Sequence, residues 1–413
     1  MRRAIAILFL VITGFRALAA DMREWTDRLG RKFTAEIIAN DAWRVTFALP
    51  DRTKAVLALS QLSPADVSFV TTWREANPTA PLVDPQKLAP WPADASAANI
   101  EVKARVEKPE EPSFAYEGAH FIMHSDVKLP LGVVRDLNGV FEGTRAALMA
   151  LPLGLHSGGE TQKYPVLLFS TAEMYGAAGG GTASGGYFQG FTGRMLILLP
   201  NLGIRVSGDT KTFDYQKNLF VLKHEVTHQI LRQGGRAFPV WFREGFAEVI
   251  AATPYVRGRY TFSAMDTAIG TYVQKWRSPG DLKPLYLIQP ARLMELDDSS
   301  WEARVAGQSA YELYNSAALF TYFLLRHDGA GGGSAVAGFL DSLRREQTRE
   351  RAGAARSPFG EYTRPPISEF AKKAVADFIL RGRTDEKLTA DFAAFLKRRG
   401  LRVEFEVPLG TVR

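Results

Sequence analysis

Two histidines and a glutamate lie within five consecutive residues, in the segment His224-Glu225-Val226-Thr227-His228. Apolar residues recur at helical spacing through this part of the chain, so we expect an amphipathic helix. Side chains four residues apart lie one turn apart on the same face of a helix, so His224 and His228 can bind one metal ion together. Imidazole is a common ligand of zinc, and Glu225 is placed to take a proton from water. The motif therefore predicts a zinc site (Zn²⁺) that carries out hydrolysis.

A zinc site with two histidines needs at least one further protein ligand. Pro239 is a helix-start signal, and the helix expected from Trp241 carries Glu244 and Glu248 on one face. Enough residues separate His228 from this helix for a turn and an antiparallel return. Two histidines and one glutamate leave the fourth position of zinc open for water, which is typical of catalytic rather than structural zinc. The spacing alone does not choose between the two glutamates.

The two expected helices resemble those of the gluzincin metallopeptidases, in which His-Glu-x-x-His is followed by a helix with a Glu-Gly-x-Ala-Glu-like sequence. The chain has Glu-Gly-Phe-Ala-Glu over residues 244–248. The resemblance implies that Glu244 is the third zinc ligand. It implies that Glu248 orients a zinc-bound imidazole through the other ring nitrogen. It also implies a thermolysin-like catalytic domain over residues 113–254, with a mixed sheet and an active-site helix.

The same resemblance suggests two further functional segments. The sequence from Tyr314 to Leu319 is similar to an aminopeptidase helix whose tyrosine hydrogen-bonds the oxyanion, which makes Tyr314 a candidate catalytic residue; a buried aromatic side chain in a helix core is the alternative. In the family, the edge strand before the active-site helix binds extended substrate. This role falls on Met195, Leu196, Ile197 and Leu198.

Several segments are expected to position these residues. Apolar alternation and buried runs predict strands over 119–124, 164–170 and 195–199, with a helix over 137–151. Eight glycines between 176 and 193 suggest either a mobile flap or a surface turn. Residues 255–413 are expected to form a helical subdomain, with helices over 311–326, 366–380 and 385–399.

A separate domain is predicted over residues 21–76, where apolar residues alternate in three short runs between turn signals. The pattern predicts a small antiparallel barrel. The segment opening Arg23-Glu24-Trp25-Thr26-Asp27 and closing Leu62-Ser63-Pro64-Ala65-Asp66 resembles the Sla homology domain, an SH3-like barrel. The resemblance implies either a binding site for a protein or envelope ligand or a plain accessory barrel. Residues 77–112 are rich in proline and predict a stiff, extended linker.

The first twenty residues have the pattern of a secretory signal peptide. Basic residues at the start precede an apolar run and the small-residue site Ala17-Leu18-Ala19. We expect export by the general secretion route to a bacterial periplasm or exterior, with no transmembrane anchor after cleavage. The absence of cysteine excludes disulfides, thiolate zinc sites and cysteine catalysis. The net charge of +7 is too small for a chain of 413 residues to argue for nucleic-acid binding.

The sequence therefore predicts an α+β protein of several domains. The leading hypothesis is an exported zinc metallopeptidase that hydrolyses peptide or protein substrates, with Glu225 as general base for water activated by zinc. The alternative is a non-catalytic envelope protein that uses a peptidase fold to bind polypeptide or to act as a scaffold. The sequence does not decide between endopeptidase and exopeptidase.

Overall fold

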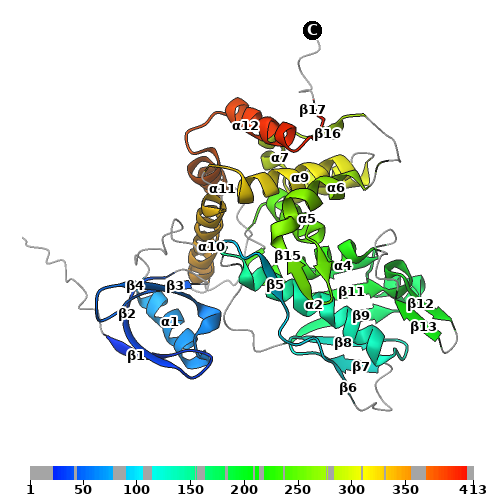
Figure 1. Ribbon diagram of the computed structural model, residues 1–413, viewed down its shortest axis with the longest axis horizontal. Helices are drawn as coiled ribbons and strands as arrows, with labels where there is room; N and C mark the ends of the chain where they lie inside the picture. The colour runs from blue at the N-terminus through cyan, green and yellow to red at the C-terminus, as the bar shows by residue number, and fades with distance from the viewer. Residues whose placement is uncertain are drawn as a thin grey trace, which may run out of the picture. The chain divides into compact units, whose positions relative to one another are not determined.

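The structure is a computed structural model of the 413-residue chain. It describes residues 22–40, 44–77, 90–105, 114–153, 155, 163–181, 185–207, 210–213, 218–235, 238–275, 277, 283–307, 310–329, 332–354 and 369–406. The fold is α+β, as predicted (Figure 1). The chain divides into two compact units, with the second beginning at Asp84. The predicted signal peptide, residues 1–20, lies outside the described residues.

The first unit is an open antiparallel sheet with one helix. Its strands are β1 (Arg23–Thr26), β2 (Lys32–Asn40), β3 (Arg44–Ala48) and β4 (Lys54–Ala58), paired in chain order, and a 3-10 turn (Leu59–Gln61) leads to α1 (Pro64–Ala76). The core consists of buried apolar side chains, among them Trp25, Phe47 and Val70. The three predicted strand segments are confirmed.

The prediction of a closed barrel over residues 21–76 is wrong, because the described strands form no closed barrel. Residues 64–76 form a helix instead of continuing the sheet. Pro64 opens the helix, and the Ser63 hydroxyl accepts a hydrogen bond from the Asp66 N–H at 3.2 Å, which satisfies a free donor of the first turn. The Asp66 carboxylate in turn accepts the Thr26 N–H at 2.8 Å, so the helix start is attached to β1.

The second unit contains a six-stranded sheet of order β10-β11-β9-β8-β7-β6. Strands β8 (Phe121–Ser125), β9 (Tyr164–Phe169) and β11 (Arg194–Leu198) run parallel, which confirms the three predicted strands. Strands β6 (Lys103–Ala104), β7 (Phe114–Glu117) and β10 (Gly186–Gln189) pair antiparallel with their neighbours. Helix α2 (Leu131–Ala150) connects β8 to β9 and starts earlier than the predicted residue 137.

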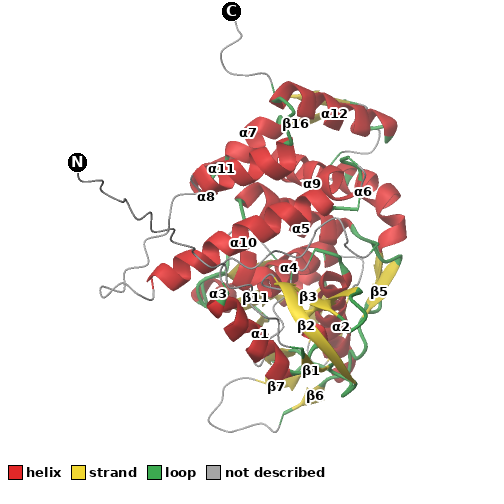
Figure 2. Ribbon diagram, turned by 90° about the vertical axis from the view of Figure 1, so that its left-hand side faces the viewer, coloured by secondary structure: helices red, strands yellow, loops and turns green. Residues whose placement is uncertain are grey.

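Helices stack outward from this sheet. Helix α4 (Leu219–Gly235) packs on β10, β11 and α2, α5 (Val240–Ala252) packs on α4, and α9 (Ala310–Arg326) packs on α5. In Figures 1 and 2 the sheet, α4, α5, α9 and α12 (Asp385–Arg398) follow one another along the second unit. The helices predicted over 311–326 and 385–399 are confirmed. The segment predicted as a helix over 366–380 is α11 (Glu369–Ala374) followed by a π-helical stretch (Val375–Leu380).

Smaller elements complete the second unit. The helices are α3 (Ala172–Ala177), α6 (Met265–Gln274), α7 (Pro290–Glu295), α8 (Asp298–Ala306) and α10 (Ser334–Ala354), with 3-10 turns at Leu199–Leu202 and Phe262–Ala264. The strands are β5 (Asp94–Ser96), β12 (Ile204–Ser207), β13 (Thr210–Phe213), β14 (Tyr255–Val256), β15 (Arg259–Thr261), β16 (Leu285–Leu287) and β17 (Val403–Phe405). No helix in the described part of the chain combines the length and apolar character needed to cross a membrane.

The part of the predicted linker that the structure describes from residue 90 on is packed with the second unit. The linker predicted over 77–112 includes β5, which pairs with β15, and β6, which pairs with β7. The Trp91 indole also donates to the Gly332 carbonyl at 2.9 Å. Residues 113–254 and 255–413, predicted as two subdomains, share a single hydrophobic core with side chains from Ala95 to Leu401. Proline content marked an extended segment, but it did not show that the segment pairs with the sheets.

Candidate metal centre

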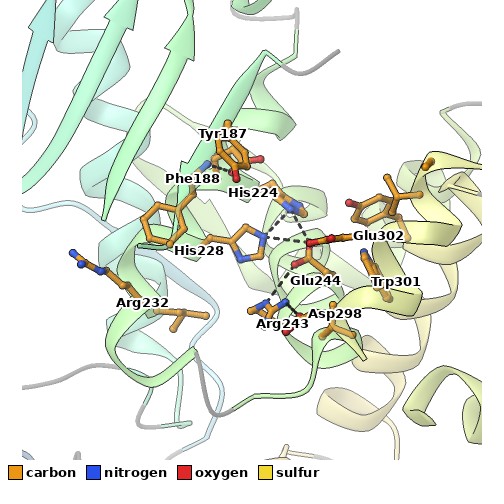
Figure 3. Close-up of a pocket in the computed structure, with 17 residues that line it drawn as sticks. Tyr187, Phe188, His224, His228, Arg232, Arg243, Glu244, Asp298, Trp301 and Glu302 are labelled. Atoms are coloured by element: carbon orange, nitrogen blue, oxygen red, sulfur yellow. Dashed lines mark hydrogen bonds and ion pairs between the residues drawn. The ribbon is translucent and has the colours of Figure 1, made fainter. Parts of the chain in front are cut away.

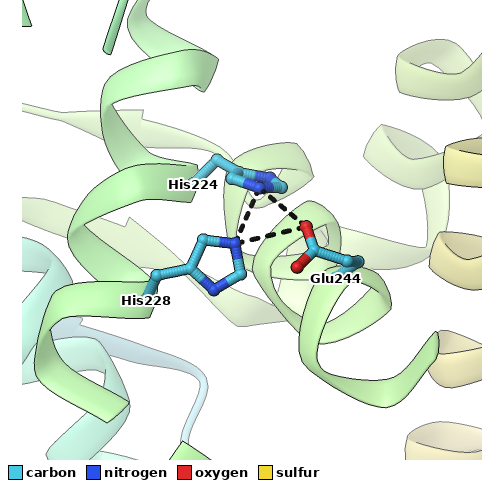
Figure 4. A group of neighbouring side chains, drawn as sticks. All are labelled: His224, His228 and Glu244. Atoms are coloured by element: carbon cyan, nitrogen blue, oxygen red, sulfur yellow. Dashed lines mark hydrogen bonds and ion pairs between the residues drawn. The ribbon is translucent and has the colours of Figure 1, made fainter. Parts of the chain in front are cut away.

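Helix α4 places its two histidines toward α5. Its residues Leu222, Val226 and Ile230 are buried in the core, so the opposite stripe carries His224 and His228. Helix α5 follows after a short connection and places Glu244 opposite them (Figure 4). The antiparallel return predicted from the spacing therefore brings the three side chains together.

The three candidate ligand atoms form a nearly equilateral triangle. His224 Nε2 and His228 Nε2 lie 2.9 Å apart, and each lies 3.3 Å from Glu244 Oε2 (Figure 4). Ligands of tetrahedral zinc with bonds of about 2.0–2.1 Å lie about 3.3 Å from each other. The donor set of two imidazoles and one carboxylate, and the distances between the donor atoms, therefore fit a zinc ion with one coordination position left for another group.

Glu248 holds His224 from the side away from the triangle. Glu248 Oε1 lies 2.9 Å from His224 Nδ1, and the Tyr272 hydroxyl donates to Glu248 Oε2 at 2.5 Å. A carboxylate can only accept, so His224 Nδ1 carries a proton, and a metal ion that displaces the second proton would bind Nε2 inside the triangle. The geometry thus gives the two glutamates different positions, which the sequence spacing did not distinguish.

Arg243 holds the other ligand carboxylate. Its Nε lies 3.5 Å from Glu244 Oε1, and its Nη2 donates to Asp298 Oδ1 at 2.6 Å (Figure 3). One oxygen of Glu244 is therefore directed to the guanidinium and the other to the histidines. Sequence reasoning missed Arg243, because a charged residue beside a motif gives no sign of which way it points. It missed Tyr272 and Asp298, because they lie on other helices far from the motifs in the sequence.

Glu225 lies beside the triangle and contacts the sheet. Its Oε2 accepts the Phe188 N–H from β10 at 2.9 Å. Burial raises the pKa of Glu225, while the imidazoles of His224 and His228 and the Phe188 N–H act in the opposite direction. The carboxylate is therefore fixed in place and is a stronger base than an exposed glutamate.

The electrostatics of the triangle favour a bound cation. Burial by itself would lower the pKa of His224, but hydrogen bonds with Glu244 and Glu248 raise it well above its usual value. Burial would likewise raise the pKa of Glu244, but the imidazoles, His228 first, hold it well below its usual value. The carboxylates stay ionised, and they attract positive charge into the space between the three side chains.

A cleft of about 710 Å³ opens over this cluster (Figure 3). Tyr314 lines it, with its ring centroid 6.2 Å from that of His224, and Trp301 packs edge-on against Tyr314. Burial raises the pKa of Tyr314, so its hydroxyl stays protonated and can donate a hydrogen bond. The structure therefore places Tyr314 in the same cleft as the two histidines, and its ring also packs against the hydrophobic core.

The prediction that Met195, Leu196, Ile197 and Leu198 form an edge strand open to substrate is wrong. These residues form β11, which lies between β9 and β10 in the sheet, and none of them lines the cleft. Their side chains are buried. The glycine-rich segment that was expected to be a flap or a turn contains the true edge strand, β10, and its Tyr187 and Phe188 line the cleft.

Neither a protein-family model nor a curated protein sequence matches the chain. The similarity to gluzincins and to the Sla homology domain therefore rests on the residues quoted above. The arrangement of His224, His228 and Glu244 is given by the distances between their donor atoms and does not depend on that similarity.

Proposed function

We propose that the chain is an exported zinc-dependent metallopeptidase with a gluzincin-like catalytic unit, acting on peptide or protein substrates. The observation that carries the proposal is the triangle of His224, His228 and Glu244 donor atoms at the wall of an open cleft. A structural zinc site would be closed by a fourth protein ligand, whereas here His and Glu supply three donors. Glu225 beside the triangle adds a base that a purely structural site does not need.

A bound zinc ion would lower the pKa of a water molecule and polarise a substrate carbonyl. Glu225 takes one proton from the attacking water, whose oxygen forms a bond with the carbonyl carbon. Glu225 then delivers that proton to the amide nitrogen as the carbon–nitrogen bond breaks. The Tyr314 hydroxyl donates a hydrogen bond to the carbonyl oxygen while negative charge develops there. The Phe188 N–H keeps Glu225 in position during both transfers.

The remaining parts of the proposal rest on the sequence. The signal-peptide pattern at residues 1–20 favours a secreted or periplasmic protein of a bacterium. The first unit is a candidate binding module for a protein or envelope ligand. Neither part is needed for the chemistry proposed at the cluster.

Metal analysis combined with digestion of a broad peptide library tests the proposal. We expect one zinc per chain and cleavage by the wild type. Glu225→Gln should keep zinc and fold but lose turnover by several orders of magnitude, because an amide cannot accept the proton. A zinc-bound wild type that binds peptides but cleaves none would contradict the proposal and favour the non-catalytic polypeptide-binding alternative. Equal cleavage by Glu225→Gln would remove Glu225 from the mechanism.

A further inference from the structure

Most of the charges that line the cleft are already neutralised by neighbours. Glu225 and Glu244 belong to the metal centre. The Arg243 guanidinium is shared between Glu244 and Asp298, at 3.5 and 2.6 Å. A charged group of a substrate would therefore gain little binding free energy from an ion pair with these side chains.

Two charged side chains of the cleft differ from these. Arg232, in the last turn of α4, donates to the Phe191 carbonyl at 3.3 Å and has no carboxylate partner among the described residues. Glu302, on α8, makes no hydrogen bond or ion pair within the part of the chain that the structure describes. Both side chains are exposed to solvent. They carry opposite charges that remain available to a ligand.

These two charges lie on opposite sides of the metal centre. Figure 3 shows Arg232 on the α4 side of His228 and Glu302 with Trp301 on the other side, beyond Glu244. The apolar side chains Leu231 and Val305 line the cleft as well, and they can contact an uncharged part of a ligand. The two ends of the cleft therefore carry opposite charges, with a cation at the Arg232 end and an anion at the Glu302 end.

A second cavity continues the anionic end. It measures about 880 Å³ and shares Asp298 with the cleft. Its lining includes the carboxylates of Glu295, Asp297 and Asp385 against the single cation Lys372. The lining of this cavity therefore has more carboxylates than cations, which extends the acidic character of the Glu302 end.

We propose that the cleft selects polypeptide segments with a carboxylate at the Arg232 end and a cation at the Glu302 end. This inference deepens the proposed peptidase function and rests on it for the claim that the bound segment is cleaved. The carboxylate can come from an Asp or Glu side chain or from a free C-terminus, since either presents the same group to a guanidinium. The cation is a Lys or Arg side chain or a free N-terminus.

Peptide binding to the full-length, zinc-loaded Glu225→Gln variant tests the inference without turnover. Labelled peptides carry one Glu and one Lys, in both orders, separated by one to four alanines, with both ends blocked. We expect one order to bind roughly threefold to tenfold more tightly than the reverse, and the difference to shrink in high salt, as for exposed ion pairs. A second set replaces the Glu side chain by a free C-terminal carboxylate and separates the two sources of that group.

Charge-reversal variants decide whether Arg232 and Glu302 cause the preference for one peptide order. Arg232→Glu combined with Glu302→Lys should reverse the preferred order, and each single variant should abolish the preference. Arg135→Glu and Glu173→Lys change exposed charges of α2 and α3 that do not line the cleft, and they should leave the preference as in the wild type. Equal binding of both orders, or the same preference after the double reversal, would overturn the inference.

The same peptides are incubated with the wild type to separate this inference from the proposed function. Order-dependent binding without any cleavage would refute the peptidase and leave the charge recognition standing. Cleavage of both orders at equal rates, with equal binding, would leave the peptidase standing and refute the charge recognition.

Discussion

In the candidate metal centre, two of the three candidate ligands, His224 and Glu244, are held by neighbouring side chains. His224 is fixed by Glu248, and Glu248 is fixed by Tyr272. Glu244 is fixed by Arg243. Such partners hold ligand orientation before the metal arrives, so less free energy is lost in ordering the side chains on binding.

The two glutamates of α5 are expected to respond differently to mutation. Glu244→Ala should abolish stoichiometric zinc, because only two donors remain. Glu248→Gln should keep zinc but weaken its affinity roughly 10–100-fold, as is common for partners of ligating histidines. Competition with a chromophoric chelator measures both affinities. Tyr272→Phe serves as the milder comparison, because it removes only the hydroxyl that donates to Glu248. Full zinc in Glu244→Ala would transfer the ligand role to Glu248.

Two buried lysines near the centre should make stability depend on pH. Burial lowers the pKa of both Lys223 and Lys275 to about 7, whereas an unfolded lysine titrates at about 10.4. A lowered folded-state pKa means that stability is complete above the unfolded value and is lost as pH falls toward 7. We expect the free energy of unfolding to rise between pH 7 and pH 10. Denaturant titrations of the wild type across this range measure the slope.

Lys223→Met and Lys275→Met should each reduce that slope, because the group that must be deprotonated in the folded state is gone. Lys223 donates to the Thr253 carbonyl at 2.7 Å, so its variant also loses one hydrogen bond. Lys397→Met, at an exposed position of α12, should keep the wild-type slope. An unchanged slope in both variants would show that other groups control the pH dependence.

Residue-level prediction succeeded where the chemistry is encoded in short spacing. His224 and His228 are brought together by one helix, and this follows from their separation alone. The Phe188 N–H bond to Glu225 could not be found in the same way, because it depends on which strand borders α4. Every residue except proline has a backbone N–H, so the residue type does not show which N–H will bind a side chain.

At the scale of elements, the cluster depends on how closely α5 can approach its neighbours. Helix α5 lies between α4 and α9 and carries Glu244 and Glu248. A Cβ atom at Gly245 would lie 2.3 Å from the Ala317 carbonyl oxygen and 2.3 Å from Thr321 Oγ1. The glycine that follows the ligand therefore permits the contact between the two helices.

Gly245→Ala should destabilise the protein and disturb the metal centre. Backbone of α9 cannot move aside as a side chain could, so α5 must shift, at a cost of about 1–3 kcal/mol. Zinc affinity should fall as Glu244 moves with the helix. Gly270→Ala in α6 is the matched control, since a Cβ there meets nothing within 4 Å, and alanine should be neutral or stabilise by about 0.5–1 kcal/mol. Denaturation and zinc titration of both variants decide the point, and equal behaviour would contradict it.

Elements with strong periodicity were predicted well, and those set by pairing partners were not. The parallel strands β8, β9 and β11 are apolar runs and were located within a few residues. Strand β10 was missed because glycine-rich sequence is poor in strand formers and is ordered here by pairing with β11. The error had a functional consequence, since it assigned the edge position to the wrong strand.

At the scale of the whole molecule, the candidate metal centre and its cleft lie in the second unit. Every residue of the cluster and the cleft lies between Tyr187 and Tyr314. The second unit nevertheless begins at Asp84, well before the residues that the sequence assigned to a catalytic domain. Proline-rich composition indicated where the chain is extended, but an extended chain can equally be a sheet edge or a packed strap.

This difference predicts where the chain can be shortened. A protein that begins at Asp84 should fold, bind zinc and cleave short peptides like the full-length chain. A protein that begins at Pro112 should lose β5, β6 and the hydrogen bond from Trp91 to Gly332. It would also lose the Ile100 carbonyl that accepts from buried Asn138 at 2.9 Å on α2. Leaving that amide without its partner costs about 1–3 kcal/mol on its own.

Thermal denaturation, zinc content and peptide turnover of the two shortened proteins, each compared with the full chain, test this prediction. We expect the Pro112 start to melt at a clearly lower temperature, and the Asp84 start to match the full chain in zinc content and turnover. Asn138→Ala in the full-length chain isolates one of the lost contacts, and it should reproduce only part of the destabilisation. Equal melting of both shortened proteins would mean that residues 84–111 add no stability. An Asp84 start that binds zinc at matched stability but cleaves nothing would mean that residues before Asp84 are needed for catalysis.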